Sequence, residues 1–142
     1  MHMGKRIDDI PCHCLKIRRS AENVTRFYDK VLAPSGITAR QCSLLGSIYA
    51  NPGCSIRDLA EDTILDRSTL TRSLKPLLEL GYIEDRRHTG ARNSVLKLTE
   101  QGTAVYREAY ALWKQAQQEL EQKVGKRNLA QMESMLLLLQ DL

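Results

Sequence analysis

The segment from residue 66 to residue 79 places hydroxyl and cationic side chains on one face of a predicted helix. Leu70 and Leu74 occupy the opposite, buried face at helical spacing. Short donors can bond base edges and phosphates in nucleic acid, and an arginine can bond guanine bidentately in the major groove. The residues expected to make these contacts are Arg67, Ser68, Thr69, Thr71, Arg72 and Lys75.

A basic tract, DRRHTGARN at 85–93, lies between two segments of strand composition, GYIE and SVLKL. Gly90 suits a turn, so the sequence predicts a two-stranded hairpin. Its tip would follow a DNA backbone as a wing and insert one arginine into a narrow minor groove. Arg92 is the favoured residue for the minor groove, and the other arginines expected to contact DNA here are Arg86 and Arg87.

Six helices would position these side chains. Their predicted ranges are 14–32, 38–50, 55–63, 66–79, 100–123 and 129–142. The predicted N-caps are Thr38, Ser55 with Asp58 three residues later, Asp66 and Thr99. The third and fourth helices, joined by a short turn, form a helix-turn-helix. Pro76 removes one amide and predicts a late kink in the fourth helix rather than an early end.

Apolar residues at three- and four-residue steps define the faces that should be buried. In the first four helices these are Leu15, Ile17, Val24, Phe27, Val31, Leu32, Cys42, Leu45, Ile48, Ile56, Leu59, Ala60, Leu70, Leu74, Leu77 and Leu78. The sequence therefore predicts a mainly α fold with a small β-hairpin wing.

Composition narrows the function. The 142 residues suit one domain, and the net charge is +4 with a pI near 9.0. Seven of the cations, against four acids, lie between residues 66 and 97, so most of the excess positive charge lies in the predicted DNA-binding segment.

No apolar run is long enough to cross a bilayer and the N-terminus lacks a signal-peptide core, so we expect a cytoplasmic protein. No phosphate loop, metal-hydrolase spacing or nucleophile elbow indicates an enzyme, and no cofactor is expected.

The segment DRSTLTRSLKPLLELGYIEDRR, followed by GARNSVLKLTEQG, resembles the winged helix-turn-helix of the multiple antibiotic resistance regulator (MarR) family. The resemblance extends back through VTRFYDKVLAPSGITARQCSLL and forward into the last two helices. It implies a sequence-specific transcriptional regulator, most often a repressor. It divides the chain into a winged region at 38–98 and helical dimerisation regions at 1–37 and 99–142.

The family's wing signature reads Asp-x-Arg, then Leu-Thr-x-x-Gly after five residues. It assigns the wing arginine to Arg92 and the closing segment to Leu98, Thr99 and Gly102. Gly90 stands where the signature has its aspartate, and the wing is about two residues shorter than the family's.

The last helix carries more apolar surface than one small core covers. Its stripe consists of Leu129, Met132, Leu136 and Leu139, widened by Leu137 and Leu138. An intramolecular bundle with the first helix is one explanation. The family resemblance instead implies an intertwined homodimer that reads a pseudo-palindromic operator, with its recognition helices roughly 34 Å apart.

Four cysteines leave three interpretations open. Cys14 aligns with the reactive cysteine of the organic-hydroperoxide-sensing branch of the family, and Tyr28 aligns with a tyrosine that contacts the thiolate there. Cys12 is the nearest partner for an oxidised Cys14. Alternatively, Cys42 and Cys54 are small buried apolar residues and the other two are incidental. The four thiols as metal ligands are the third interpretation, although their spacing fits no structural zinc site.

The family resemblance also implies a small aromatic or lipophilic effector between the dimerisation helices and the winged region. The aromatic residues near that space are interpreted here as packing; they are Phe27, Tyr28, Tyr106, Tyr110 and Trp113. A winged-helix module that binds an acidic protein rather than DNA remains the alternative function.

Overall fold

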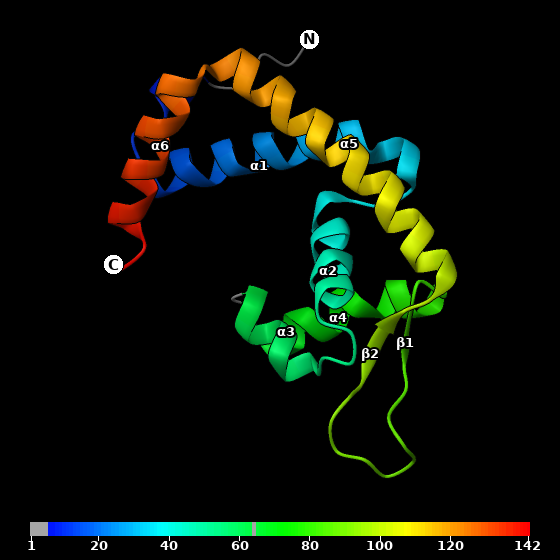
Figure 1. The fold of residues 1–142 in the computed structure, drawn as a ribbon. Coiled ribbons are helices and arrows are strands. Elements are labelled where there is room, and N and C mark those ends of the chain that lie inside the picture. The colour runs from blue at the N-terminus through cyan, green and yellow to red at the C-terminus, as the bar shows by residue number, and fades with distance from the viewer. Residues whose placement is uncertain (1–5, 64) are drawn as a thin grey trace.

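A computed structural model describes residues 6–63 and 65–142, and within them the chain forms six α-helices, two short 3-10 turns and one antiparallel hairpin (Figure 1). The elements are η1 (Ile7–Asp9), α1 (His13–Leu32), η2 (Ala33–Ser35), α2 (Ala39–Ala50), α3 (Ile56–Thr63), α4 (Arg67–Glu79), β1 (Ile83–Asp85), β2 (Leu96–Leu98), α5 (Glu100–Val124) and α6 (Lys126–Leu139). The predicted mainly α fold with a hairpin wing is confirmed.

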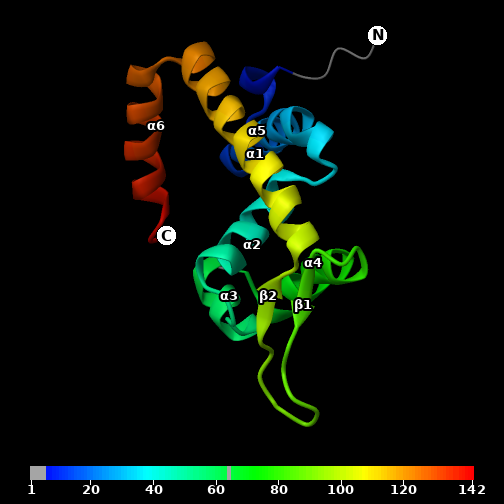
Figure 2. The same ribbon diagram turned by 45° about the vertical axis from the view of Figure 1, so that its right-hand side comes forward.

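The helices separate into two groups along the molecule. Helices α2, α3 and α4 gather with the hairpin at one end, whereas α1, α6 and the far half of α5 lie at the other (Figure 1). Helix α5 runs from the base of the hairpin to the far end and so joins the two groups. After a 45° turn the hairpin still projects beyond the neighbouring helices (Figure 2), so the wing extends away from the main body.

Side chains cap the helices around the predicted DNA-binding segment. Thr38 and Gln41 form a reciprocal capping box at the start of α2. The same exchange joins Ser55 and Asp58 at the start of α3, over 2.9 and 3.1 Å. Each cap satisfies amides that have no partner within the helix, so these starts are fixed by residues three apart in sequence. The predicted caps are confirmed.

The hydrophobic core lies under the winged end. Leu44, Leu45 and Ile48 of α2 pack with leucines of α3 and α4 and with Leu96 of β2. On α4, Leu70, Leu74 and Leu77 are buried as predicted, but Leu78 is 42% exposed, so its predicted burial is wrong. Leu78 widens the stripe beyond the arc that the neighbouring helices cover. The helix itself continues through Pro76 to Glu79, as predicted.

The outer helices are much less covered than the sequence pattern predicts. On α1, Leu32 is buried, but Leu15, Ile17 and Val24 are between 42% and 53% exposed, which corrects their predicted burial. The structure describes α6 in full, and no residue of it is buried. This helix also begins and ends three residues earlier than predicted, because it starts directly after Gly125. Within residues 6–63 and 65–142, no intramolecular bundle therefore covers the apolar face of α6.

A close backbone contact fixes where α5 leaves the hairpin. Thr99 caps α5 by accepting from the amide of Gly102, and its hydroxyl donates to the carbonyl of Gly81. A Cβ at Gly102 would lie 1.8 Å from the carbonyl oxygen of Tyr82, a distance that no side chain permits. Glycine is therefore required where the first turn of α5 lies against the backbone of Tyr82, just before β1.

Candidate nucleic-acid interface

Asp66 organises the start of α4. Its Oδ1 accepts from the amide of Thr69 at 2.7 Å, and its Oδ2 accepts from the Thr69 hydroxyl at 3.1 Å. These hydrogen bonds, with a smaller effect from Arg72, hold the pKa of the Asp66 carboxyl below its ordinary value. Asp66 is thus charged at neutral pH at the positive end of the helix dipole, which stabilises the first turn.

The face of α4 opposite the buried leucines is open to solvent. Five of its six predicted contact residues are exposed: Arg67, Ser68, Thr71, Arg72 and Lys75. Thr69 differs, because it is half-buried and its hydroxyl is used in the cap. The structure therefore presents a surface of short donors and cations and assigns Thr69 mainly to holding the helix start.

The wing is tied together at its base by Asp85. Strands β1 and β2 pair with Ile83 opposite Leu98. Beyond them, Asp85 Oδ1 accepts from the amides of Val95 and Arg87. Arg87 Nε also pairs with Asp85 Oδ2 at 3.0 Å. One carboxylate thus joins the two arms of the hairpin and directs an arginine side chain along it.

The arginines of the wing differ in their partners. Arg86 pairs with Glu84 at 2.6 Å; the arginine is exposed and the glutamate is partly buried. Arg92 is exposed, and no ion pair involves it among residues 6–63 and 65–142. Two residues before it, Gly90 has a φ of +85°, a conformation that disfavours the aspartate of the family signature. The guanidinium of Arg92 is therefore not held by a neighbouring carboxylate.

A groove of about 340 Å³ joins the recognition helix to the wing. Its walls include Arg67 and Thr71 of α4 and Arg87 and Arg92 of the wing, so the structure brings four predicted contact residues together. It also adds Arg57, from the first turn of α3, which the sequence reasoning missed. The available signal was the exposed cation two residues after the Ser55 cap, but nothing local indicated that it faces the wing.

The N-terminal cysteines lie away from this interface. Cys12 and Cys14 are exposed, whereas Cys42 and Cys54 are buried in the core of the winged end. Burial raises the pKa of both buried thiols, as expected for inert apolar positions. Across the described ranges, no three His, Cys, Asp or Glu side chains converge as metal ligands do.

Tyr28 does not meet Cys14 within one chain. Both lie on the continuous helix α1, and a separation of 14 residues corresponds to about 21 Å. The Tyr28 hydroxyl instead donates to Gln117 of α5. Burial, with a smaller contribution from the charge of Glu121, raises the pKa of Tyr28. A contact between Cys14 and Tyr28 therefore requires two chains.

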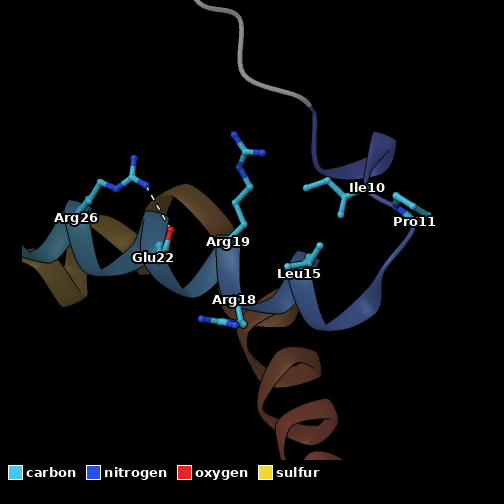
Figure 3. A pocket seen from close by; sticks show the side chains of 7 residues that line it. All are labelled: Ile10, Pro11, Leu15, Arg18, Arg19, Glu22 and Arg26. Atoms are coloured by element: carbon cyan, nitrogen blue, oxygen red, sulfur yellow. Dashed lines mark ion pairs between the residues drawn. The ribbon is translucent and has the colours of Figure 1, made fainter. Parts of the chain in front are cut away.

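A groove of about 570 Å³ runs along α1 from Leu15 to Arg26 (Figure 3). Ile10 and Pro11, on the segment before the helix, line it together with Leu15, and basic side chains continue it along α1. Arg26 of this row pairs with Glu22 at 3.6 Å. The groove thus combines an apolar end with a largely cationic wall: Arg18, Arg19 and Arg26.

Two hollows flank α2. The larger, about 560 Å³, lies between α1 and the winged end and includes Tyr28, Arg40 and Asp62 in its lining. The smaller, about 190 Å³, is lined by Tyr106, Tyr110 and Trp113 with residues of α2. In the second hollow the aromatic rings form a row, with centroids 5.8 and 5.6 Å apart, so these side chains both pack together and border a space.

Within the described part of the chain, no helix combines the length and apolarity that membrane crossing needs.

The known proteins that this chain resembles are transcriptional regulators. The pattern of the MarR family matches residues 35–92. Over 93 residues the chain is 34% identical to the HTH-type transcriptional regulator BilQ of Clostridium symbiosum, and the match spans 65% of each chain. The chain therefore aligns with somewhat less than two thirds of the length of this curated relative.

Solved structures extend the similarity over nearly the whole chain. The transcriptional regulator MosR of M. tuberculosis, crystallised with DNA, is 30% identical, with 91% of this chain and 98% of that one covered and a TM-score of 0.72. A mutant MarR of E. coli, complexed with operator DNA, has a TM-score of 0.80 over 96% of this chain and 99% of that one. Its identity is 24%, so this second likeness concerns the fold alone.

Proposed function

The chain belongs to the MarR family of winged-helix transcriptional regulators, and from that premise we propose that it is a repressor that binds a specific DNA operator as a homodimer. The observation that carries this proposal is the exposed face of α4, whose donors and cations stand beside a basic wing. The solvent face of a helix without a binding partner ordinarily carries both acidic and basic side chains, whereas this face carries mainly hydroxyls and cations. The region 38–98 would bind DNA, and regions 1–37 and 99–142 would dimerise.

Each contact residue has a proposed role. Helix α4 enters the major groove, where Ser68, Thr71 and Arg72 reach base edges and Lys75 meets a phosphate. The wing follows the backbone, and Arg92 enters the minor groove because no carboxylate holds its guanidinium. The remaining proposed backbone contacts are Arg67, Thr69, Arg86 and Arg87.

Dimerisation is proposed from the uncovered apolar surface. Leu15 and Ile17 of α1 are about half exposed, and Leu137 and Leu138 of α6 are more exposed still. Apolar patches of this extent are rare on isolated soluble proteins and mark association sites. A two-fold dimer buries the same surfaces on both chains and sets two recognition helices roughly one DNA turn apart.

Release from DNA is proposed to follow effector binding in the larger hollow between α1 and the winged end. Its volume, about 560 Å³, suits a small organic molecule, and Arg40 provides a cation for an acidic group. An aromatic or lipophilic acid bound there would contact both regions of the chain and so shift their relative placement. Loss of release by aromatic carboxylates on Arg40→Gln would support this site.

Thiol oxidation is the second proposed route to release, because Cys14 is exposed on the helix that we assign to dimerisation. An organic hydroperoxide would transfer one oxygen to the Cys14 sulfur, which becomes a sulfenic acid as the O–O bond breaks and the alcohol leaves. Cys12 is the nearest thiol in sequence that could then react with it.

A footprint on the DNA flanking the protein's own gene tests the function. We expect a protected, pseudo-palindromic site and an affinity that falls steeply with salt, since each phosphate contact releases counterions. Arg72→Ala should abolish the protection. Binding to an acidic protein without any protected DNA would favour the protein-interaction alternative.

The same footprint, repeated after cumene hydroperoxide, tests thiol sensing. Release of the wild-type protein but not of Cys14→Ser would establish Cys14 as the sensor. Retention of both on the operator would exclude it and leave release to an effector. A location in the cytoplasm and a non-enzymatic role are part of the same proposal.

A further inference from the structure

We propose that the groove between α3, α4 and the wing seats one phosphate group of the DNA backbone and that Arg57 is an additional phosphate-binding residue. The proposal deepens the proposed function and rests on it. Arg57 comes from the first turn of α3, outside both the recognition helix and the wing, yet it lines the same groove as Arg67, Arg87 and Arg92. Four guanidinium groups thus border one small hollow.

The charge of this groove is poorly compensated. Arg57 is paired only loosely with Glu61, at 3.9 Å, and both side chains are more than 70% exposed. Arg87 has a firmer pair with Asp85. Neither Arg67 nor Arg92 takes part in an ion pair within residues 6–63 and 65–142. Since exposed pairs contribute little, most of the positive charge remains available to an anion.

The groove is also held in shape before any ligand arrives. The amide of Ile56 donates to Ser94 Oγ at 2.8 Å, and this serine is only 6% exposed. The bond joins the first turn of α3 directly to the second arm of the wing. The Ser55 and Asp58 cap fixes the same turn from the other side. A preformed site loses little conformational freedom on binding.

The groove lies between the recognition helix and the wing, and this position favours a DNA phosphate as its ligand. If α4 lies in the major groove and the wing lies in the adjacent minor groove, the strand that separates these grooves passes between them. The backbone of that strand then crosses the hollow that Arg57 borders. Guanidinium groups bind phosphate oxygens bidentately, and the hollow, at about 340 Å³, has room for a phosphodiester with part of its sugar.

The test uses the full chain and the operator found by footprinting. Arg57→Gln should lower operator affinity about five- to tenfold. Because a dimer carries two copies, the slope of log K against log salt should become shallower by about two, at roughly 0.9 per phosphate contact. Arg57→Lys should keep the wild-type slope because it keeps the charge. Arg107→Gln, which removes an exposed arginine of α5 outside the groove, should change neither quantity.

A second measurement locates the phosphate. Neutral methylphosphonate linkages placed one at a time along the operator should include one per half-site that weakens the wild-type protein clearly more than Arg57→Gln, because the variant has already lost one of the four guanidinium contacts to that phosphate. A titration with inorganic phosphate separates the two sources of the group. Saturation of the groove well below 1 mM phosphate would indicate a site for the free anion and overturn the assignment to DNA.

The outcomes distinguish this proposal from the regulator itself. Suppose that the wild-type protein binds the operator and Arg57→Gln has the same affinity and salt slope. The proposed phosphate site at Arg57 is then wrong, whereas the proposed function as a DNA-binding regulator is retained. If the wild-type protein binds no DNA, both fail. The Arg57 side chain is exposed, so its replacement should leave the thermal unfolding midpoint unchanged, which circular dichroism can check.

Discussion

Helices α4 and α6 are nearly equal in length, at 13 and 14 residues, and both carry a stripe of leucines, yet they end in opposite environments. Three leucines of α4 are at most 1% exposed, whereas Leu137 and Leu138 of α6 are 67% and 78% exposed. Helix α4 packs against α3 and the hairpin, while α6 extends from the end of α5 and none of its residues is buried by the described part of the chain. An apolar stripe therefore predicts burial without saying which molecule supplies the covering surface.

The two ends of the molecule also differ in how their helices begin. Side chains cap α2, α3, α4 and α5, whereas neither Cys12 before α1 nor Gly125 before α6 provides a side-chain cap. The winged end is completed by its own residues. The helical end leaves apolar side chains exposed, and we assign that surface to a second copy of the chain. Substitutions at the two ends should therefore have different effects.

The largest loss of operator affinity is expected from substitutions on the exposed apolar face of α6, at the helical end. Leu137→Glu combined with Leu138→Glu should convert the dimer to a monomer, because it places charge on the surface that we assign to association. Operator affinity should fall by about 1,000-fold, since two linked half-site contacts become independent. Sedimentation and fluorescence anisotropy measure both changes. Leu80→Glu, a half-exposed leucine of the winged end, is the control and should stay dimeric.

The winged end should respond to a loss of core volume instead. Leu74→Ala removes a fully buried side chain and should lower the free energy of unfolding by about 2–5 kcal/mol. Leu78→Ala, on the same helix but 42% exposed, should cost less than about 1 kcal/mol. Urea unfolding at several protein concentrations distinguishes these effects from dimer dissociation. Equal losses for the two variants would contradict the observed burial.

A smaller effect is expected at the junction of the two ends. Gly102→Ala brings a Cβ against the carbonyl of Tyr82 and should lower the free energy of unfolding by about 1–3 kcal/mol. Gly46→Ala provides a milder comparison, because its Cβ would meet only the movable ring of Tyr106, at 3.2 Å. Thermal unfolding of the pair measures the difference. If Gly102→Ala left the thermal unfolding midpoint unchanged, the close approach of α5 to the backbone of Tyr82 would be contradicted.

The smallest effect is a pH dependence confined to the winged end. Hydrogen bonds from Ser55 to Asp58, and from Thr69 to Asp66, lower the pKa of both carboxyls. Their stabilising contribution is therefore fully present above the ordinary carboxyl pKa and is lost as the pH falls through the lowered values. Unfolding measured from about pH 6 to about pH 3 should show this loss. Asp66→Asn should make the dependence shallower, and an unaltered profile would contradict the cap.

Much of the winged end was predictable because its signals are local. The caps at Thr38, Ser55, Asp66 and Thr99 act over three residues, and Gly90 sets a turn by its own backbone freedom. The helical period then identifies the inward faces of α2, α3 and α4, although Ile56 and Ala60 are only partly buried and Leu78 is exposed. The predicted contact face of α4 followed from the same periodicity.

The candidate site was only partly predictable. Arg57 escaped notice because nothing within its own helix relates it to Arg92, 35 positions later, and the hydrogen bond between Ile56 and Ser94 brings the two segments together. The cap at Asp66 was predicted from the sequence, but the additional hydrogen bond from the Thr69 hydroxyl to its carboxylate was not. Tyr28 was linked with Cys14; the rise of α1 separates the two within one chain, so their contact stays a prediction for a dimer, and within one chain the Tyr28 hydroxyl donates to Gln117.

By itself the sequence determined where the four capped helices start, where the hairpin turns and which faces are apolar, because those properties depend on interactions between residues a few positions apart. The tertiary structure alone decided which apolar faces find cover within one chain, which leave Leu137 and Leu138 exposed, and which distant arginines share a groove. Burial and electrostatic grouping depend on the surface that another element brings, and no local pattern encodes that surface.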